Sequence, residues 1–317
     1  MGEKKTITVF GATGAQGGGL VRAILADREG DFAVRAVTRR ADSEKARELE
    51  RLGVQVIQAD MDDEASLGPA FEHAYGAYLV TDFWDHMSAE REKAQALALA
   101  QAASHAGVQH AIWSTLEDTR ECIPLEDTRM PTLQEHYKVP HFDGKAEADR
   151  YFTEAGVPTT FLRSTFYWEN LLGMFSPQRA EDGAFELVLP MGDSRLSGIA
   201  VDDIGKTALA VFKRDTDLIA ATVSIAGEHL KVADMASALS EALGQTVRYR
   251  PVTAGAFRAL GFPGADEAGN MFQFYADCED HFTAARDLIA VRELNPALQD
   301  FRTWLAAHGE ELRAAWA

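Results

Sequence analysis

The sequence predicts an α/β protein: a doubly wound parallel sheet with a smaller α/β C-terminal domain. In the first half of the chain, short β-rich runs alternate with helical stretches, which is typical of βαβ units. A glycine-rich turn, GATGAQGGGL, directly follows the first of these runs. After residue 163 the regular alternation ends, which indicates that a second domain begins near that point.

The alternating half contains a series of expected strands with helical patterns between them. We expect strands at 6–10, 32–38, 54–58, 77–81, 110–114 and 159–163, and helices at 17–26, 43–51, 88–106 and 143–155. Residues 115–141 break this rhythm, because the stretch is polar and punctuated by proline. A loop of that length beside a strand end is typical of a lid or of a mobile segment.

The second half has a different order of elements. We expect helices at 201–213 and 231–243 and near 266–276, 283–293 and 298–308, with strands at 221–225 and 247–250. No linker separates the two halves cleanly. We therefore expect a first domain over 1–165 that also takes up about 198–226. The remainder of 166–317 then forms the smaller second domain.

Composition places the chain among ordinary globular proteins and excludes two classes of partner. The 317 residues are 46% hydrophobic and 25% charged, which is enough to bury a full core. The formal net charge of −18 argues against nucleic acid as a direct ligand, because phosphate contacts need a basic face. No apolar run is long enough to span a bilayer, so we expect no membrane partner.

The N-terminus predicts a cytoplasmic protein. It enters a strand almost at once, which leaves no room for a secretory leader. Met1-Gly2 with Thr6 also fits the short N-myristoylation pattern.

Cysteine and histidine positions predict no metal site. Cys122 and Cys278 are far apart in the sequence, so we expect neither a disulfide framework nor a thiolate metal site. Four histidines lack the spacing of metal ligands and are expected on the surface or in the 115–141 loop: His105, His110, His136 and His141.

The turn after the first strand carries Gly11, Gly14 and Gly17 in the spacing G-x-x-G-x-x-G. Such a turn permits a tight bend, a close backbone approach to a pyrophosphate and close packing of the next helix on the strand. The helix N-terminus offers N–H groups and a positive dipole end to phosphates. Because the motif lies between a strand and a helix, it predicts dinucleotide binding.

The end of the second strand favours NADP. A protein that prefers NAD places an acidic residue near this point to bond the ribose 2′-hydroxyl. This chain has Arg39 and Arg40 instead, with Lys45 close behind. A guanidinium suits a 2′-phosphate in charge and in fork geometry. The alternative is that these basic residues are simply the solvated start of a helix.

Polar residues also follow the next two strands. Asp60 ends the third strand and is placed to accept from the adenine amino group, while Met61 is placed to pack on the ring. Helix N-capping explains the following Asp62 equally well. The fourth strand ends at 81–83, on the edge along which cofactors lie in open sheets.

Residues 137–145 read YKVPHFDGK, with His141 four positions before Lys145. In short-chain dehydrogenases a tyrosine stands at that distance from the lysine and forms an acid–base pair with it. Histidine can serve as a general acid at neutral pH. A lysine at this position can also serve only to bind the nicotinamide ribose, without any part in catalysis. His141 and Lys145 are thus candidate catalytic residues. Ser114 and Thr115 either orient a substrate or close the fifth strand.

Two aromatic groups have alternative explanations. The run FYW at 166–168 packs in a core or covers the nicotinamide ring. Phe272, Phe274 and Tyr275 pack between the domains or belong to a partner surface.

Several phrases of the sequence resemble the NmrA-like family of atypical short-chain dehydrogenase-like proteins. They are VFGATGAQGG, VTRR, VTDFW, WSTLED, HFDGKAEADRYF and FYWENLL, and LGFPGADEAGNMFQFY is similar to the NADPH-sensor members of that family. The resemblance runs from about residue 5 to residue 308. It implies a Rossmann domain, a smaller C-terminal substrate or regulatory domain, and NADP bound in the cleft between them.

The resemblance also implies which residues bind the cofactor. With Gly17 from the glycine motif, they are Gly11, Ala12, Thr13, Gly14, Ala15, Gln16, Arg39, Arg40, Ser43, Asp60, Met61, Thr81, Asp82, Phe83, Lys145, Tyr167, Trp168, Glu169 and Asn170. One position departs from the family: a helix lysine that helps to hold the cofactor is replaced by Ala94, with Lys93 one step away.

The family contains true reductases and also members that bind NADP(H) and act as redox-responsive regulators. The phrase HFDGK resembles the second kind, so we expect an NADP(H)-binding redox sensor or regulator with little turnover. The alternative is an NADPH-dependent reductase of a small carbonyl, imine or enone substrate. The expected partners are NADP(H) and a protein that contacts the C-terminal domain, and the expected state is a monomer or a homodimer.

Overall fold

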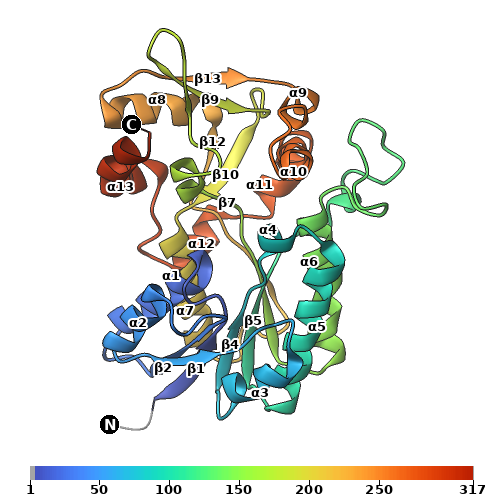
Figure 1. Cartoon of the computed structure of the whole chain (residues 1–317), viewed down its shortest axis with the longest axis vertical. Helices are drawn as coiled ribbons and strands as arrows, with labels where there is room; N and C mark the ends of the chain where they lie inside the picture. The colour runs from blue at the N-terminus through green and yellow to red at the C-terminus, as the bar shows by residue number, and fades with distance from the viewer. Residues whose placement is uncertain (1–3, 317) are drawn as a thin grey trace. The chain divides into compact units, whose positions relative to one another are not determined.

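The computed structural model describes residues 4–316, and Figure 1 traces its elements. The strands are β1 (Lys5–Val9), β2 (Phe32–Thr38), β3 (Gln55–Gln58), β4 (Gly76–Leu79), β5 (His110–Thr115), β6 (Thr159–Arg163), β7 (Phe166–Tyr167), β8 (Gln178–Arg179), β9 (Phe185–Leu189), β10 (Arg195–Ile199), β11 (Thr222–Ser224), β12 (Glu228–Lys231) and β13 (Val247–Pro251). The α-helices are α1 (Ala15–Ala26), α2 (Glu44–Arg51), α3 (Glu64–Phe71), α4 (Phe83–His86), α5 (Ala89–His105), α6 (Pro140–Glu154), α7 (Val201–Lys213), α8 (Val232–Leu243), α9 (Ala254–Arg258), α10 (Ala265–Asp277), α11 (Glu279–Ala284), α12 (Leu288–Leu294) and α13 (Phe301–Ala315). The 3₁₀ helices are η1 (Thr119–Glu121) and η2 (Trp168–Leu172).

The Met1-Gly2 part of the myristoylation pattern lies outside the described residues. Across residues 4–316, every helix is too short or too polar to cross a membrane.

Within the described chain, the largest sheet has seven strands in the order β11-β6-β5-β4-β1-β2-β3. β1 pairs in parallel with β2 on one side and with β4 on the other, and parallel pairing continues outward to β3 and to β6. The strand order therefore reverses between β1 and β4, which is the topological switch point of an open α/β sheet. The prediction of a doubly wound parallel Rossmann sheet is confirmed.

Helices cover both faces of this sheet. On one face, α3, α5 and α6 share a buried cluster with the strands that includes Phe71, Phe152 and Ala111. The neighbour of Ala111 on β5 is His110, whose ring lies 5.2 Å from that of Phe212 on α7. Because successive strand residues point to opposite faces, α7 packs on the other side of the sheet.

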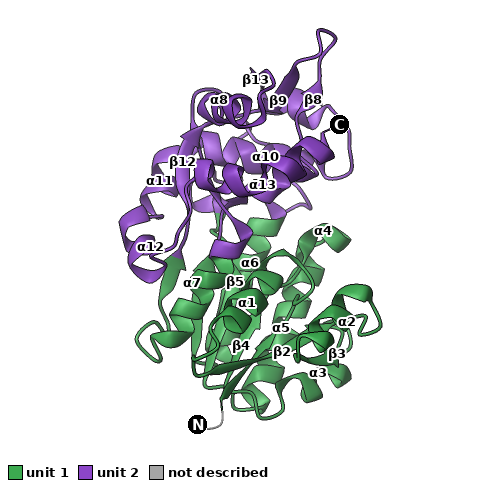
Figure 2. Ribbon diagram, turned by 90° about the vertical axis from the view of Figure 1, so that its left-hand side faces the viewer, with its two compact units in different colours: residues 1–118, 141–163, 204–223 green, residues 119–140, 164–203, 224–317 purple. Residues whose placement is uncertain are grey.

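The described residues form two compact units, coloured green and purple in Figure 2. The first contains the chain up to Asp118, then His141–Arg163 and Ile204–Val223, and so includes the seven-stranded sheet. The second contains Thr119–Pro140, Ser164–Asp203 and the chain from Ser224 onward. The segment 119–140, which the sequence analysis placed in the first domain, thus groups with the second unit.

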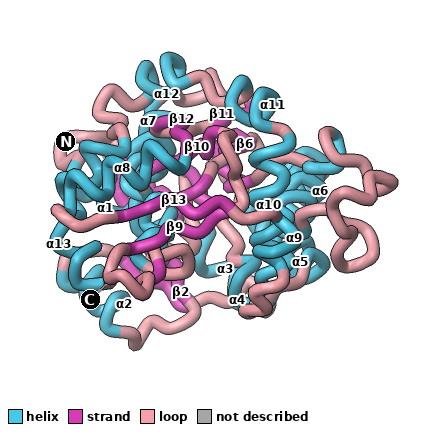
Figure 3. Tube along the Cα trace, turned by 90° about the horizontal axis from the view of Figure 1, so that it is seen from above, coloured by secondary structure: helices cyan, strands magenta, loops and turns pink. Residues whose placement is uncertain are grey.

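The second unit is built from two small sheets and several helices. In one sheet β10 pairs antiparallel with β12 and parallel with β7, and in the other β9 pairs parallel with β13 and antiparallel with β8. Figure 3 shows β9 beside β13, and α9 beside α10. The expected helix near 283–293 is interrupted, because the carboxylate of Asp287 accepts the N–H groups of Ile289 and Ala290 and so begins α12 anew.

Cys122 and Cys278 form a disulfide within the second unit. The expectation that the two cysteines form no disulfide is therefore wrong. They are 156 residues apart in sequence, yet their Cα atoms are 6.4 Å apart, because the 119–140 segment folds back onto the end of α10. Separation along the chain says little about distance in a folded domain.

Candidate functional site at the carboxyl end of the large sheet

The glycine turn between β1 and α1 has a shape that side chains would block. Gly11 has a φ of +64°, in the left-handed region that favours glycine. A Cβ on Gly17 would lie 2.4 Å from the carbonyl oxygen of Gly11. The N–H of Gly14 donates to that same oxygen at 2.9 Å and closes the turn before α1 begins. The turn thus brings the backbone at a helix N-terminus to the end of β1, an arrangement that suits a pyrophosphate.

Gln16 fixes the turn to the neighbouring strands. Its side chain is buried, and Oε1 accepts hydrogen bonds from the hydroxyl of Tyr78 on β4 and, at 2.8 Å, from Ser114 Oγ on β5. The hydroxyl of Ser114, a candidate for orienting a substrate, therefore donates to Gln16. Of the other turn residues, Ala12 is buried, Thr13 is partly buried and Ala15 is exposed.

Arg39 and Arg40 follow β2 as predicted, and both are exposed. Nη1 of Arg39 lies 2.7 Å from Oδ2 of Asp85 on α4. The hydrogen bond from Arg39 lowers the pKa of Asp85. A 2′-phosphate at this point would therefore either displace the carboxylate of Asp85 from Arg39 or bind the guanidinium of Arg39 together with it.

Ser43 and Lys45 lie at the start of α2. Ser43 caps the helix, because its Oγ accepts the N–H of Ala46 at 3.2 Å. Nζ of Lys45 lies 3.4 Å from the carbonyl oxygen of Thr13, so this basic side chain reaches the glycine turn.

Asp60 and Met61 lie at the end of β3. Oδ1 of Asp60 accepts the N–H of Asp62 at 3.0 Å, which makes a local turn, and Met61 packs partly buried against the apolar cluster of the sheet. The N-cap of α3 is Asp63. The N-capping explanation of Asp62 is therefore wrong.

The carboxylate of Asp62 makes two side-chain contacts instead of a cap. It pairs with Arg91, and its Oδ1 accepts from Nε2 of Gln95 at 3.0 Å. Both partners lie on α5, so Asp62 connects the loop after β3 to that helix.

Residues 81–83 connect β4 to α4. Oγ1 of Thr81 donates to Oε1 of Glu92 at 2.7 Å and accepts from Nζ of Lys145, also at 2.7 Å. Burial is the main reason that the pKa of Asp82 is raised, and nearby carboxylates raise it further. Phe83 is buried.

Lys145 on α6 is also buried, and its ammonium group is held by several oxygen atoms. Nζ lies 2.9 Å from Oε1 of Glu92, in addition to its bond with Thr81 Oγ1. The carbonyl oxygens of Thr81 and Ser114 lie 3.4 Å from Nζ, and the ring centroid of Trp113 lies 4.8 Å away. The structure therefore fixes the position of Lys145 at the ends of β4 and β5.

Glu92 is the partner that the sequence analysis missed. Its side chain is completely buried in α5. Burial alone would raise the pKa of Glu92, but the charge of Lys145, the ring of His86 with Nε2 3.4 Å from Oε2, and hydrogen bonds from Lys145 and Thr81 outweigh burial and lower this pKa to about 2. No sequence pattern marked Glu92, because a glutamate in an alanine-rich helix is ordinarily a solvated residue. Lys93, the basic residue beside the departing position Ala94, pairs with Glu90 and Glu147.

His141 lies one helical turn before Lys145, among aromatic rings. Its ring centroid is 5.2 Å from that of Trp84, 5.7 Å from that of Phe83 and 4.7 Å from that of Phe142. The residue is 6% exposed. His141 is thus packed where α4 meets the start of α6, and the expectation of a surface or loop position for this residue is wrong.

Asp149 continues the stripe of α6 that carries His141 and Lys145. Its Oδ1 accepts from Nε1 of Trp113 at 3.0 Å. Burial raises the pKa of Asp149 to about 7, against the lowering effects of a hydrogen bond from Thr115 and of nearby positive charge. No sequence pattern marks this carboxylate.

The predicted residues after β6 belong to the second unit. Trp168 is buried, with ring centroids 5.4 Å from Phe301 and 6.0 Å from Trp304. The carboxylate of Glu169 accepts the N–H of Val201 at 3.1 Å and Nε1 of Trp304 at 2.9 Å, and burial raises the pKa of Glu169. Tyr167 and Asn170 are partly buried. Trp168 and Glu169 therefore take part in the packing of this unit.

Other candidates occupy interior positions. Phe272, Phe274 and Tyr275 are buried in the second unit, where the ring of Phe282 lies 5.7 Å from that of Phe274 and 4.7 Å from that of Tyr275. A partner surface formed by these three rings is therefore contradicted.

His110 is also completely buried, so its expected surface or loop position is wrong too. Among residues 4–316, His, Cys, Asp and Glu form no group of three that could hold a metal ion.

Comparison with known proteins shows the same fold and family. The sequence model of the NmrA-like family matches residues 3–304. The NmrA-like family domain-containing oxidoreductase ptmS of Penicillium ochrochloron is 25% identical, over 96% of this chain and 97% of that protein. The NAD(P)H azoreductase of Xenophilus azovorans is 28% identical, over 98% of this chain and 100% of that protein.

Among solved structures, NmrA, a negative transcriptional regulator, in complex with NADP has a TM-score of 0.81. It is 24% identical and covers 99% of this chain and 98% of that one, which shows a shared fold. The family model covers nearly the whole chain, from the glycine turn to α13. The chain therefore belongs to the NmrA-like family.

Proposed function

We propose that this protein binds NADP(H) along the carboxyl end of the seven-stranded sheet. The observation that carries the proposal is the tight glycine turn: Gly11 has a positive φ, and a Cβ on Gly17 would collide with the backbone of the turn, so only glycine lets the start of α1 lie this close to the end of β1. The likeness to NmrA, whose structure holds NADP, supports this cofactor. The residues that would hold it are 11–17, Arg39, Arg40, Ser43, Asp60, Met61, 81–83 and Lys145.

Each part of the edge has a separate task in this proposal. The backbone of the glycine turn binds the pyrophosphate, and Arg39 and Arg40 bind the 2′-phosphate. Lys145 bonds the nicotinamide ribose, and its pairing with Glu92 and Thr81 keeps the ammonium group in one place. When bound, NADPH supplies a hydride that a suitable acceptor can take.

We infer that binding is the main activity and that the protein is a sensor of the NADPH/NADP⁺ ratio with little turnover. A proton donor has to reach the substrate oxygen within hydrogen-bonding distance. The dehydrogenase tyrosine is replaced here by His141, and this ring is packed against Trp84 and Phe83 with 6% of the residue exposed. Such packing supports an ordering role for His141 over proton transfer.

The alternative is an NADPH-dependent reductase of a small carbonyl, imine or enone substrate. The observation that favours it is the full-length likeness to proteins named as an oxidoreductase and as an azoreductase. In this case His141 would donate a proton to the reduced substrate, and Lys145 would hold the ribose beside it.

A sensor also requires a protein that receives the signal, and we propose that this partner contacts the second unit. A monomeric or homodimeric state and a cytoplasmic location stay predictions of the sequence. Analytical ultracentrifugation with and without NADPH would measure the oligomeric state.

The test measures binding and turnover on the same preparation. Calorimetric titration with NADPH, NADP⁺, NADH and NAD⁺ gives the affinities, and NADPH oxidation is followed against a panel of carbonyl, imine, enone and azo compounds. The proposal expects selective NADP(H) binding and no substrate-dependent oxidation. Rapid oxidation with one compound class would establish the reductase instead.

Two glycine variants test the location of the site. Gly17→Ala should abolish cofactor binding, because its Cβ would lie 2.4 Å from a backbone oxygen. Gly68→Ala on α3 is the matched control, since no atom lies within 4 Å of a Cβ there. Wild-type affinity of the folded Gly17→Ala variant would exclude the glycine turn as the binding site.

A further inference from the structure

The disulfide joins the junction of α10 and α11, which backbone hydrogen bonds hold in place, to the more exposed segment that follows η1. Cys278 lies between α10 and α11 and is 4% exposed. Its N–H donates to Phe274 O and its carbonyl oxygen accepts from Phe282 N–H, both at 2.9 Å, so the helix junction fixes its backbone. Cys122 is partly exposed and follows the short η1 turn. Reagents in solution therefore have better access to the sulfur of Cys122.

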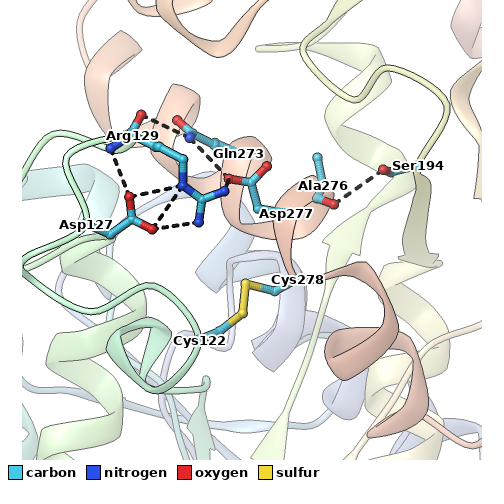
Figure 4. The surroundings of a disulfide bond; sticks show 8 residues. All are labelled: Cys122, Asp127, Arg129, Ser194, Gln273, Ala276, Asp277 and Cys278. Carbon is cyan, nitrogen blue, oxygen red and sulfur yellow. Dashed lines mark hydrogen bonds and ion pairs between the residues drawn. A yellow bond between two sulfur atoms is a disulfide. The ribbon is translucent and has the colours of Figure 1, made fainter.

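One stripe of α10 holds the 119–140 segment, and Figure 4 shows part of it around the disulfide. Asn270 is completely buried and donates from Nδ2 to the carbonyl oxygens of Pro131, at 2.9 Å, and Lys138, at 2.6 Å. Gln273 is partly buried and donates to Arg129 O at 3.1 Å in an exposed hydrogen bond. The disulfide is the covalent contact at the C-terminal end of the same stripe.

These contacts divide the segment into two parts. Residues 131–138 keep the buried amide of Asn270, and Leu133 and Tyr137 exchange two backbone hydrogen bonds. Of residues 120–128, Ile123 is buried, Arg120, Cys122 and Asp127 are partly buried, and the others are exposed. The carbonyl oxygen of Asp127 accepts from Nζ of Lys138 at 2.8 Å. Beyond the disulfide, the contacts of α10 nearest to this part are the exposed Gln273 bond and an ion pair of Arg129 with Asp277 at 3.8 Å. Exposed pairs of this kind contribute little to stability.

We propose that Cys122–Cys278 is a thiol–disulfide exchange site whose co-substrate is a dithiol, and that its redox state sets the order of residues 120–128. The proposal does not depend on NADP binding, and bound NADPH is not the reductant. It adds a thiol-dependent input to the second unit of the protein.

The exchange proceeds in two steps that balance. A thiolate of the external dithiol attacks Sγ of Cys122, which breaks the protein disulfide and releases Cys278 as a thiolate that takes up a proton. The second thiol of the reagent, as its thiolate, then attacks the reagent's own sulfur in the mixed disulfide and releases Cys122 as a thiolate, which takes up the second proton. The protein gains two electrons and two protons, and the dithiol is oxidised to its own disulfide.

The test uses the full wild-type chain without cofactor, equilibrated with oxidised or reduced dithiothreitol under native conditions. Alkylation with a mass tag counts the free thiols, and hydrogen exchange is measured separately for peptides covering 119–129 and 131–138. We expect no free thiol in the oxidised form and two in the reduced form. Exchange in 119–129 should then rise about tenfold or more on reduction, and exchange in 131–138 should change by less than about twofold.

Two variants serve as controls. Cys122→Ser with Cys278→Ser should behave like the reduced wild type in either buffer. Asn270→Ala should increase exchange in 131–138 in both redox states and leave the reaction with dithiothreitol unchanged.

Two results would overturn the proposal. The first is a disulfide that resists native reduction until denaturant is added. The second is unchanged exchange in 119–129 after both thiols have been freed.

Discussion

Nζ of Lys145 lies 2.9 Å from Oε1 of Glu92, and both side chains are buried at the end of the sheet where the cofactor is proposed to bind. The pair links α6 to α5. A buried charge without its partner strongly destabilises the fold. Removing either Lys145 or Glu92 alone would therefore leave the other as an uncompensated buried charge. Any experiment on Lys145 therefore has to take account of Glu92.

Glu92→Gln should lower the free energy of unfolding by about 3–5 kcal/mol, because it leaves the buried ammonium group of Lys145 without a counter-charge. Glu90→Gln on the same helix is the matched control. Glu90 pairs with Lys93 at 2.8 Å, but its side chain is 73% exposed, so its loss should cost less than about 1 kcal/mol. Urea denaturation measures both values, and equal losses would contradict the importance of the buried pair.

The same carboxylate predicts an acid-sensitive stability. The pKa of Glu92 is lowered from 4.5 to about 2 in the folded protein. Its contribution is therefore complete above about pH 4.5 and is lost as the pH falls toward 2. The difference in unfolding free energy between wild type and Glu92→Gln should shrink across this window. A constant difference from pH 5 to pH 2.5 would refute the assignment.

Asp149 predicts a pH dependence of opposite sign. Its pKa rises from 3.8 to about 7 on folding because the carboxyl group is buried. The folded state thus retains a proton that the unfolded state has lost, and stability falls as the pH rises between these two values. Asp149→Asn should remove this penalty, which is on the order of a few kcal/mol above pH 7.

The measurement for Asp149 is urea unfolding at several pH values between 5 and 8, with Glu154→Gln at the exposed end of α6 as control. Asn can still accept the hydrogen bond from Trp113 Nε1, so the variant changes the charge and keeps the contact. A wild-type stability that rises through this range relative to Asp149→Asn would show the sign to be wrong.

Arg39→Ala should weaken NADP binding about ten- to a hundredfold and leave NAD binding almost unchanged, because a charge-assisted contact to the 2′-phosphate is lost. Asp85→Asn should strengthen NADP binding by about two- to fivefold, since it removes the partner 2.7 Å from Arg39 Nη1. Arg51→Ala, at the exposed end of α2, is the control for charge alone. Calorimetric titration with both cofactors decides, and equal wild-type affinities for NADP and NAD would contradict the selectivity.

His141 and Lys145 should differ in what they contribute. His141→Ala should leave NADP affinity within about twofold, whereas replacing Lys145 with Met and Glu92 with Leu together should weaken it about tenfold without leaving a buried charge. If a substrate is found, loss of a proton donor in His141→Ala would reduce kcat about a hundredfold. Full NADP affinity in the folded double variant would exclude Lys145 as a ribose contact.

His141→Tyr restores the side-chain pair of the dehydrogenases. A gain of reductase activity in this variant would show that substrate has room at the site, and continued inactivity with normal NADP binding would support the sensor.

The sequence by itself determined the large sheet and the edge at which the cofactor is proposed to bind. Hydrophobic periodicity located β1 to β6 because each strand is a short apolar run that local residue pattern specifies. The glycine spacing predicted the turn before α1, because only glycine tolerates the positive φ of Gly11 and the close approach at Gly17. Strand order then placed Arg39, Asp60 and Thr81 at one edge, since parallel strands share their carboxyl ends.

Tertiary structure alone decided which side chains are partners. The pairing of Glu92 with Lys145 depends on how α5 and α6 pack on the sheet, and no local pattern marks it. The disulfide depends on the 119–140 segment folding back onto α10, so that residues 156 positions apart meet. Phe272 and Tyr275 were expected to pack between the domains or at a partner surface, and the packing of the second unit buries both rings. Hydrophobic periodicity indicates which face of a helix or strand is buried. Which side chains from distant parts of the chain become partners depends on how the helices and strands pack against one another.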